Sequence, residues 1–293
     1  IMTRLTVEYG DVSLTAKNDS NPAATDKQSF SNLALLKQTK PVYKKWATLE
    51  DGEWILDGTF ENFPDNPTAE NFAYWSESMS DANGNFGTYP ILEILFSGYE
   101  ISSGVTLYFS TLTGDYADRI NIKWYRDSTL LDDVDFTIDD ATYFCENTVE
   151  RYNKIVIAFK STRKPYRYVK LENIVYGTER TFSSEEGEFR SATLLEDVSL
   201  TSEELKINTF DFTLINKKNV EFAFQKTQPL VLRRNDELMG TFFIDKARST
   251  GNIMYDIEAI DYIGVLDSMP FAGGTYANVT VANLVESILG SIP

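Results

Sequence analysis

The fold class follows from three consecutive stretches: Ile207-Asn-Thr-Phe-Asp-Phe-Thr-Leu-Ile-Asn216, Gln228-Pro-Leu-Val-Leu-Arg-Arg-Asn-Asp-Glu-Leu-Met-Gly-Thr-Phe-Phe-Ile-Asp245 and Tyr255-Asp-Ile-Glu-Ala-Ile-Asp-Tyr-Ile-Gly-Val-Leu-Asp267. In the first stretch, Phe210, Phe212 and Leu214 alternate with polar residues. Side chains that recur with period two share one face of a β-strand. We therefore expect each of the three stretches to be a strand.

The middle stretch predicts a β-hairpin over residues 229–245. Its only polar run is Arg233-Arg-Asn-Asp-Glu237, which lies between two apolar runs. Asn235-Asp236 at the centre has the residue types that favour tight turns.

The order of these strands, followed by Phe271-Ala-Gly-Gly-Thr-Tyr276 and a short helix, resembles the tail-hub proteins of bacteriophages and prophages, including late-control-D-like baseplate hub proteins. The N-terminal half resembles members of that family whose first barrel is interrupted by a lectin-like jelly roll. The motifs that carry this second resemblance are Trp54-Ile-Leu-Asp-Gly58, Tyr74-Trp-Ser-Glu-Ser-Met-Ser-Asp81 and Lys164-Pro-Tyr-Arg-Tyr168. Such motifs specify a fold better than an activity.

Composition agrees with a mainly β protein of two domains. The chain has 293 residues, of which 13% are aromatic, and aromatic side chains suit half-buried pleated surfaces. The formal net charge of −17 disfavours nucleic acid and anionic membranes as partners. No apolar run in the sequence approaches the roughly 20 residues that span a bilayer.

Residues 2–17 read as two short strands with a turn at Gly10-Asp11, and residues 18–40 as a polar surface connector. Closely spaced turn signals from 41 to 178, among them Ser103-Gly104, favour a sandwich. The expected core strands are Ile91–Phe96, Val105–Phe109, Ile120–Trp124, Lys154–Phe159 and Tyr168–Val175. Their connections resemble those of discoidin-type, galactose-binding-like jelly rolls.

After Gly177 we expect the chain to return to the first domain, where residues 2–17 would pair. The domain prediction is a hub-type β-barrel of residues 1–40 and 179–293, interrupted by a jelly-roll sandwich of residues 41–178. A short C-terminal helix follows, with Thr280 as its N-cap and Gly290 as its stop. We expect the chain to be a fragment of a longer protein, with its barrel domain truncated.

The inventory of reactive residues argues against an enzyme. There is no histidine, which removes Ser-His-Asp and Cys-His catalysis and the usual nitrogen ligand of zinc. The single cysteine, Cys145, is expected to be an inert packing residue. Adjacent acids, such as Asp132-Asp133, point to opposite faces of a strand, so they favour a solvated surface over a glycosidase site.

The sequence offers a candidate calcium site and a candidate sugar site. Asp81-Ala-Asn-Gly-Asn85 is rich in oxygen ligands, and a structural calcium ion could use Asp81 and Glu93, although an Asx-rich turn explains the same residues. No other cofactor is expected. Carbohydrate needs an aromatic platform and polar partners on loops, for which the candidates are Tyr74, Trp75, Arg163, Tyr166 and Arg167. Tryptophan is highly buried on average, so a core role for Trp75 is favoured over ligand contact, as it is for Trp54 and Trp124.

Two functions remain open. The resemblance implies a non-catalytic component of a virion tail hub, synthesised in the bacterial cytoplasm, with other tail and baseplate proteins as partners and a homotrimer as its assembly. Neighbouring subunits are expected to meet at edge strands near 2–9 or 207–215 and at the helix 279–289. The alternative is a carbohydrate-binding module of a cell-surface adhesin or glycan-degrading protein, and the inserted jelly roll could bind a cell-surface polysaccharide in either case.

Overall fold

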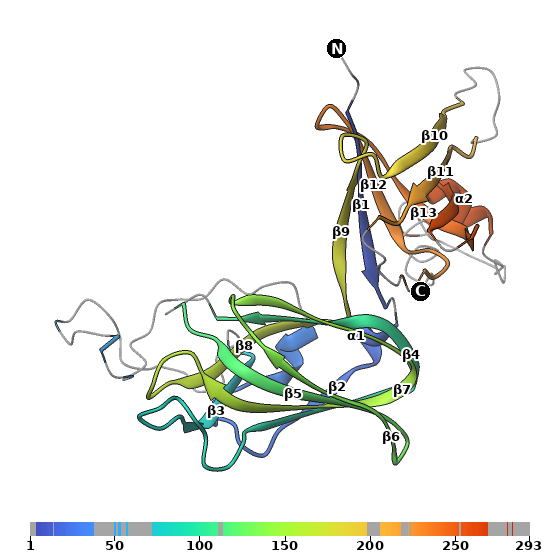
Figure 1. Ribbon diagram of the computed structural model, residues 1–293. Helices are drawn as coiled ribbons and strands as arrows, with labels where there is room; N and C mark the ends of the chain where they lie inside the picture. The colour runs from blue at the N-terminus through green and yellow to red at the C-terminus, as the bar shows by residue number, and fades with distance from the viewer. Residues whose placement is uncertain are drawn as a thin grey trace.

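The computed structural model shows a mainly β protein with two antiparallel sheets of seven strands each (Figure 1). Each sheet curls around its own hydrophobic core. In the described part of the chain, the α-helices are two short ones, α1 (Ala16–Asp19) and α2 (Tyr262–Asp267). The residues that the structure describes are 4–13, 15–37, 50, 52–53, 57, 72–110, 114–197, 206–217, 222, 224–251, 253–268, 280 and 283.

The first sheet has the order β10-β11-β14-β13-β12-β1-β9. Its strands are β1 (Leu5–Val12), β9 (Gly177–Ser183), β10 (Phe189–Leu195), β11 (Thr209–Ile215), β12 (Pro229–Arg234), β13 (Glu237–Ser249) and β14 (Met254–Ile260). β1 pairs with β9 and β12, so strands from before and after the second sheet share the first one. The edge strands β9 and β10 are not paired with each other, so the described strands form an open sheet and do not show the predicted hub-type β-barrel.

The hairpin and the first of the three stretches form as expected. β12 and β13 pair up to Arg234 and Glu237. Asn235 and Asp236 between them both have positive φ, 51° and 67°, as a type I′ turn requires. In β11, the alternating apolar side chains at 210, 212 and 214 are all buried in the core of the first sheet.

The third stretch is only half strand, so the prediction for residues 261–267 was wrong. β14 ends at Ile260, and Asp261 becomes the N-cap of α2 by accepting a hydrogen bond from the amide of Gly264. An aspartate that satisfies a free amide in the first turn favours helix over continued strand. The Asp261 carboxylate also accepts a bond from the amide of Asn208, which holds this corner against β11.

The N-terminal segment forms one strand, which corrects the predicted turn at Gly10-Asp11. Both residues lie within β1 opposite β9. The buried Asp11 side chain accepts hydrogen bonds from the Tyr9 hydroxyl (3.2 Å) and from Arg180 Nε (3.1 Å). Local composition favoured a turn, but an arginine 169 residues away neutralises this carboxylate inside the fold.

The second sheet has the order β3-β8-β4-β7-β5-β6, and β2 pairs with β4. Its strands are β2 (Asn21–Ala23), β3 (Tyr74–Met79), β4 (Ile91–Phe109), β5 (Ala117–Arg126), β6 (Thr129–Thr137), β7 (Thr142–Thr162) and β8 (Tyr168–Val175). β4 and β7 are long, with 19 and 21 residues, and they curve so that the sheet folds over its core (Figure 1). This curled arrangement fits a β-sandwich jelly roll, and Trp124 is fully buried in it.

Two predicted core strands, Ile91–Phe96 and Val105–Phe109, are parts of the single strand β4. Ser103-Gly104, expected to be a turn, is a bulge at which the register with β7 shifts. Gly104 has a φ of 148°, and a Cβ there would lie 2.2 Å from the carbonyl oxygen of Cys145. Glycine is therefore needed for close backbone approach, not for a reversal of the chain.

The segment expected to be a connector, residues 18–40, contacts the second sheet as far as it is described. β2 pairs with β4, and Leu35 and Leu36 of the 3₁₀ helix η1 (Leu33–Lys37) belong to the core of the sandwich. The domain limits at 40/41 and 178/179 stay predictions. The C-terminal helix at 279–289 and Trp54 lie outside the described residues, apart from residues 280 and 283.

We predict that Gly177→Ala destabilises the protein strongly. Gly177 has a φ of 128°, and a Cβ there would lie 2.0 Å from the Asp11 carbonyl oxygen, so the free energy of unfolding should fall by more than about 2 kcal/mol. Gly114→Ala is the matched control, since Gly114 also has positive φ but no atom lies within 4 Å of an added Cβ. That change should cost about 1 kcal/mol. Equal losses in chemical denaturation would contradict the close-approach argument.

Candidate functional site

The connections of the second sheet meet at one end of the sandwich, which we call the loop end. Its described segments are residues 80–90 between β3 and β4, 114–116 before β5, and 163–167 between β7 and β8. Backbone hydrogen bonds join them: the Tyr166 amide donates to the Asp81 carbonyl (3.3 Å) and the Arg163 amide to the Tyr116 carbonyl (3.1 Å). Loops gathered on a rigid sandwich are a common place for binding residues.

Arg167 anchors the loop end from inside. Its side chain is 5% exposed and pairs with the buried Asp115 (2.9 Å) and with Glu53 (2.8 Å). Its Nη1 donates to the carbonyls of Pro165 (3.1 Å) and Tyr166 (3.0 Å). Every nitrogen of this guanidinium is thus bonded, which a buried charge requires. Arg167, predicted as a sugar ligand, instead holds the loop in shape.

Tyr166 is one of the aromatic residues that the loop end exposes; Tyr89, which is 47% exposed, is another. It is 41% exposed, and its φ of 55° places it in the left-handed region. Such a conformation is costly for a residue with a large side chain and persists only when its surroundings impose it. Its amide and carbonyl are both bonded, to Asp81 and Arg167, so the backbone that carries the ring is fixed.

Arg163 and a second tyrosine complete the exposed surface. The exposed Arg163 guanidinium lies 5.3 Å from the ring centre of Tyr116, an arrangement that holds both side chains by cation–π attraction. Beside them, Arg119 donates to Asn85 Oδ1 (2.7 Å). Sequence reasoning missed Tyr116, Asn85 and Arg119, and the only available signal was their position beside Gly-Asp and Asn-Gly turns.

Tyr74 and Trp75 do not form the expected platform. Tyr74 is fully buried and stacks on Phe159, with ring centres 5.7 Å apart. Trp75 is 6% exposed and packs edge-on against Phe30 and Phe72. Neither ring offers a face to solvent, so the core role weighed for Trp75 is the one that the structure supports.

The residues suggested for calcium are apart. Asp81 Oδ1 accepts the amides of Asn83 and Asn85, both at 2.8 Å, as in an Asx turn. Glu93 lies on β4 opposite Val156 and pairs with Lys154 (3.3 Å), whereas Asn85 bridges to Ser161. Five residues of strand separate Val156 from Ser161, or about 16 Å. Asp81 and Glu93 therefore do not share an ion, and the described residues contain no group of three metal-ligating side chains.

Asp133, Asp135 and the Cys145 thiol do not have the pKa shifts that catalysis by these groups would need. Asp133 and Asp135 share the amide of Asn121, at 2.7 and 2.8 Å. Hydrogen bonds from Asn121 and Lys123 lower the pKa of Asp133, and those from Lys160 and Asn121 lower the pKa of Asp135. A glycosidase general acid needs the opposite shift. Burial raises the pKa of the Cys145 thiol to about 12, so this thiol stays protonated and unreactive at neutral pH.

Comparisons with known proteins give only remote similarities. No protein-family model matches the chain, and no curated protein matches it. Among solved structures, the family 32 CBM from C. perfringens NanJ in complex with galactose has a TM-score of 0.35 and 8% identity, covering 57% of this chain and 97% of that one. The wild-type discoidin II from Dictyostelium discoideum has a TM-score of 0.29 and 10% identity, covering 86% of this chain and 91% of that one. No helix in the described residues is both long and apolar enough to cross a bilayer.

We predict an acid-sensitive contribution from Glu53. Burial raises the pKa of this carboxyl, but hydrogen bonds from Lys164 and Arg167 outweigh burial and hold the pKa below its ordinary value. Because the folded pKa is the lower one, the stabilisation is complete above the unfolded pKa of about 4.3 and is lost as pH falls through the folded pKa. Glu53→Gln should therefore lower the free energy of unfolding by about 1–2 kcal/mol at pH 7, and the difference should shrink below about pH 4.

The measurement is urea denaturation from pH 7 to pH 3. Asp236→Asn is the control, because its pair with Arg4 is exposed, with 71% of the aspartate side chain accessible, and exposed pairs contribute about 0–1 kcal/mol. A difference between wild type and Glu53→Gln that does not change with pH would contradict the assignment.

Proposed function

We propose that this chain is a non-catalytic carbohydrate-binding protein whose sugar site is the loop end. The observation that carries the proposal is Tyr166, an exposed ring on a backbone that buried Arg167 holds in a left-handed conformation. A fixed aromatic face binds the apolar side of a pyranose with little loss of conformational entropy.

Polar groups around Tyr166 fit the hydroxyls of a sugar. Arg163 is exposed in the same loop, and its guanidinium can donate several hydrogen bonds while it lies over the Tyr116 ring. Arg119, with 53% of its side chain exposed, and Asn85 extend the polar surface. The class of ligand proposed is a neutral or weakly acidic cell-surface polysaccharide, recognised by one ring face and a few hydroxyl contacts.

Binding to purified bacterial wall polysaccharides tests the proposal. Tyr166→Ala removes the aromatic ring, whose buried apolar area should contribute about 1–2 kcal/mol to the binding free energy. The variant should therefore bind about tenfold more weakly. Arg163→Ala should weaken it as well. Tyr99→Ala is the matched control, since Tyr99 is 52% exposed and lies 5.7 Å from the Arg151 guanidinium on the sheet face. Binding is measured by calorimetry. If all three variants bind like wild type, the loop end is not the sugar site.

A second candidate is the structural role in a tail hub, together with its location in a virion tail. The observation that favours an assembly role is the open first sheet, where β10 is an edge strand whose residues 190–193 are exposed. Exposed edges invite pairing with another chain. The strands expected from the sequence to be edges, near 2–9 and 207–215, are not edge strands. β1 lies between β12 and β9, and β11 lies between β10 and β14.

If the assembly role holds, the purified chain should form trimers that depend on β10. Analytical ultracentrifugation should show a trimer for wild type, and Ala192→Pro should shift it to monomer, because the Ala192 amide faces away from β11 and proline removes that donor from the open edge. Thr178→Ser is the control: it lies on β9, keeps the pairing of β9 with β1, and should leave the trimer unchanged. A monomer at all accessible concentrations would count against this second candidate.

A further inference from the structure

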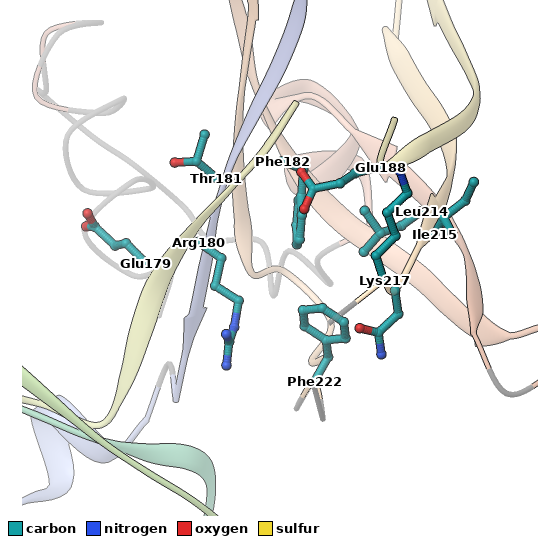
Figure 2. Close-up of a pocket in the computed structure, with 10 residues that line it drawn as sticks. Glu179, Arg180, Thr181, Phe182, Glu188, Leu214, Ile215, Lys217 and Phe222 are labelled. Atoms are coloured by element: carbon teal, nitrogen blue, oxygen red, sulfur yellow. The ribbon is translucent and has the colours of Figure 1, made fainter. Parts of the chain in front are cut away.

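A pocket of about 230 Å³ lies in the gap that leaves the first sheet open, which we call the seam. One wall is β9, with Arg180, Thr181 and Phe182, and the other includes Leu214 at the end of β11 and Phe222. Figure 2 shows Phe182 and Phe222 facing the same space, with Arg180 extending from β9 beside them. The proposed sugar site does not use this pocket.

The backbone of β9 faces the seam at alternate residues. The Ser184 amide donates to the Leu5 carbonyl, and the Ser13 amide to the Tyr176 carbonyl. These two bonds set which residues of β9 exchange hydrogen bonds with β1, and by antiparallel alternation Arg180 and Phe182 are among them. The amide and carbonyl of Thr181 therefore point away from β1 into the seam, and neither has a hydrogen-bond partner within the described residues.

Arg180 also has an unused donor at the seam. Its Nε donates to buried Asp11 (3.1 Å), and its guanidinium lies between the rings of Phe144 and Phe222, at 5.6 and 5.5 Å. Its Nη2 is buried and has no hydrogen-bond partner; it forms an ion pair with the Glu146 carboxylate, whose oxygen lies 3.7 Å away and so beyond hydrogen-bond distance. A buried donor without an acceptor is a costly arrangement that a ligand can relieve.

Two other charged groups that line the pocket, Glu188 and Lys217, are already engaged. Glu188 accepts the Ser183 amide (2.8 Å), and Lys217 donates to the Glu186 carbonyl (2.6 Å). The seam therefore offers a strand edge at Thr181, a donor at Arg180 and apolar ring faces at Phe182 and Phe222. Those features are spaced as the residues of a strand are, with side chains of one face two residues apart.

We propose that the seam binds an extended peptide segment of another protein, which adds a strand beside β9. In an antiparallel strand, the residue opposite Thr181 exchanges two backbone hydrogen bonds with it. The residue before it places a large apolar side chain against Phe182 and Phe222, and the residue after it places a carboxylate at Arg180 Nη2. The peptide is thus recognised as aromatic-x-acidic, a sequence in which charge complementarity with Arg180 fixes the direction.

The probe is the labelled peptide acetyl-Thr-Thr-Phe-Thr-Asp-Thr-Lys-amide, titrated with the full chain by fluorescence anisotropy. N-methylation of the Thr between Phe and Asp removes an amide that faces Thr181 and should weaken binding at least about tenfold. N-methylation of the Phe alters an amide that faces away from β9 and should leave the affinity unchanged. Replacing Asp by Lys in the peptide should abolish binding, because two cations would meet at Arg180.

Two measurements on the protein side complete the test. Hydrogen exchange at the Thr181 amide should slow on binding, whereas the amides of Arg180 and Phe182 are already in the ladder with β1 and should not change. Thr181→Pro removes the outward amide without breaking that ladder and should lose binding; if it does not fold, the N-methylated peptides still decide. Absence of binding up to about 1 mM peptide, equal affinity of the two N-methylated peptides, or self-association that blocks β9 would overturn the proposal.

Discussion

The structure depends on one close approach of two chain segments, where Val12 lies opposite Gly177. Here the chain leaves the first sheet for the second and returns 165 residues later, and the Ser13 amide bonds the Tyr176 carbonyl (2.8 Å) as both segments pass. A large insertion into a sheet is tolerated when its ends are adjacent, because the host strands then keep their register. Gly177 makes this adjacency possible, since a side chain there would collide with the backbone of Asp11.

That junction also sets where the loop end can lie. β8 ends at Val175, beside the junction, and begins at Tyr168, next to Arg167. Its eight residues separate the two places by about 26 Å. The proposed sugar site is therefore at the far end of the sandwich from the first sheet, whereas the seam lies within the first sheet itself. A ligand at either place leaves the other accessible.

Sequence patterns predicted strands where alternation itself reports burial, as in β11, and the I′ hairpin where two turn residues suffice. They failed where a distant partner decides: Gly10-Asp11 and Ser103-Gly104 resemble turns but lie inside strands. At the loop end, Arg163 and Tyr166 are exposed as a site requires. Tyr74 and Trp75 are buried on both faces of β3, because residues 28–32 cover the face that a two-layer sandwich would leave open. The local sequence of β3 contains no signal that residues 28–32 cover it.

Two arginines, the buried Arg167 and the partly buried Arg180, explain why the loop end and the seam should behave differently. Arg167 has acceptors for all its nitrogens, so its charge is fully used to hold the backbone of Tyr166 in place. Arg180 has an acceptor for Nε but none within hydrogen-bond distance for buried Nη2. A saturated guanidinium makes a rigid support that a ligand does not disturb, whereas one with a free donor gains a bond when an acceptor arrives. Preorganisation therefore favours ligand contact through Tyr166 at the loop end, and through Arg180 itself at the seam.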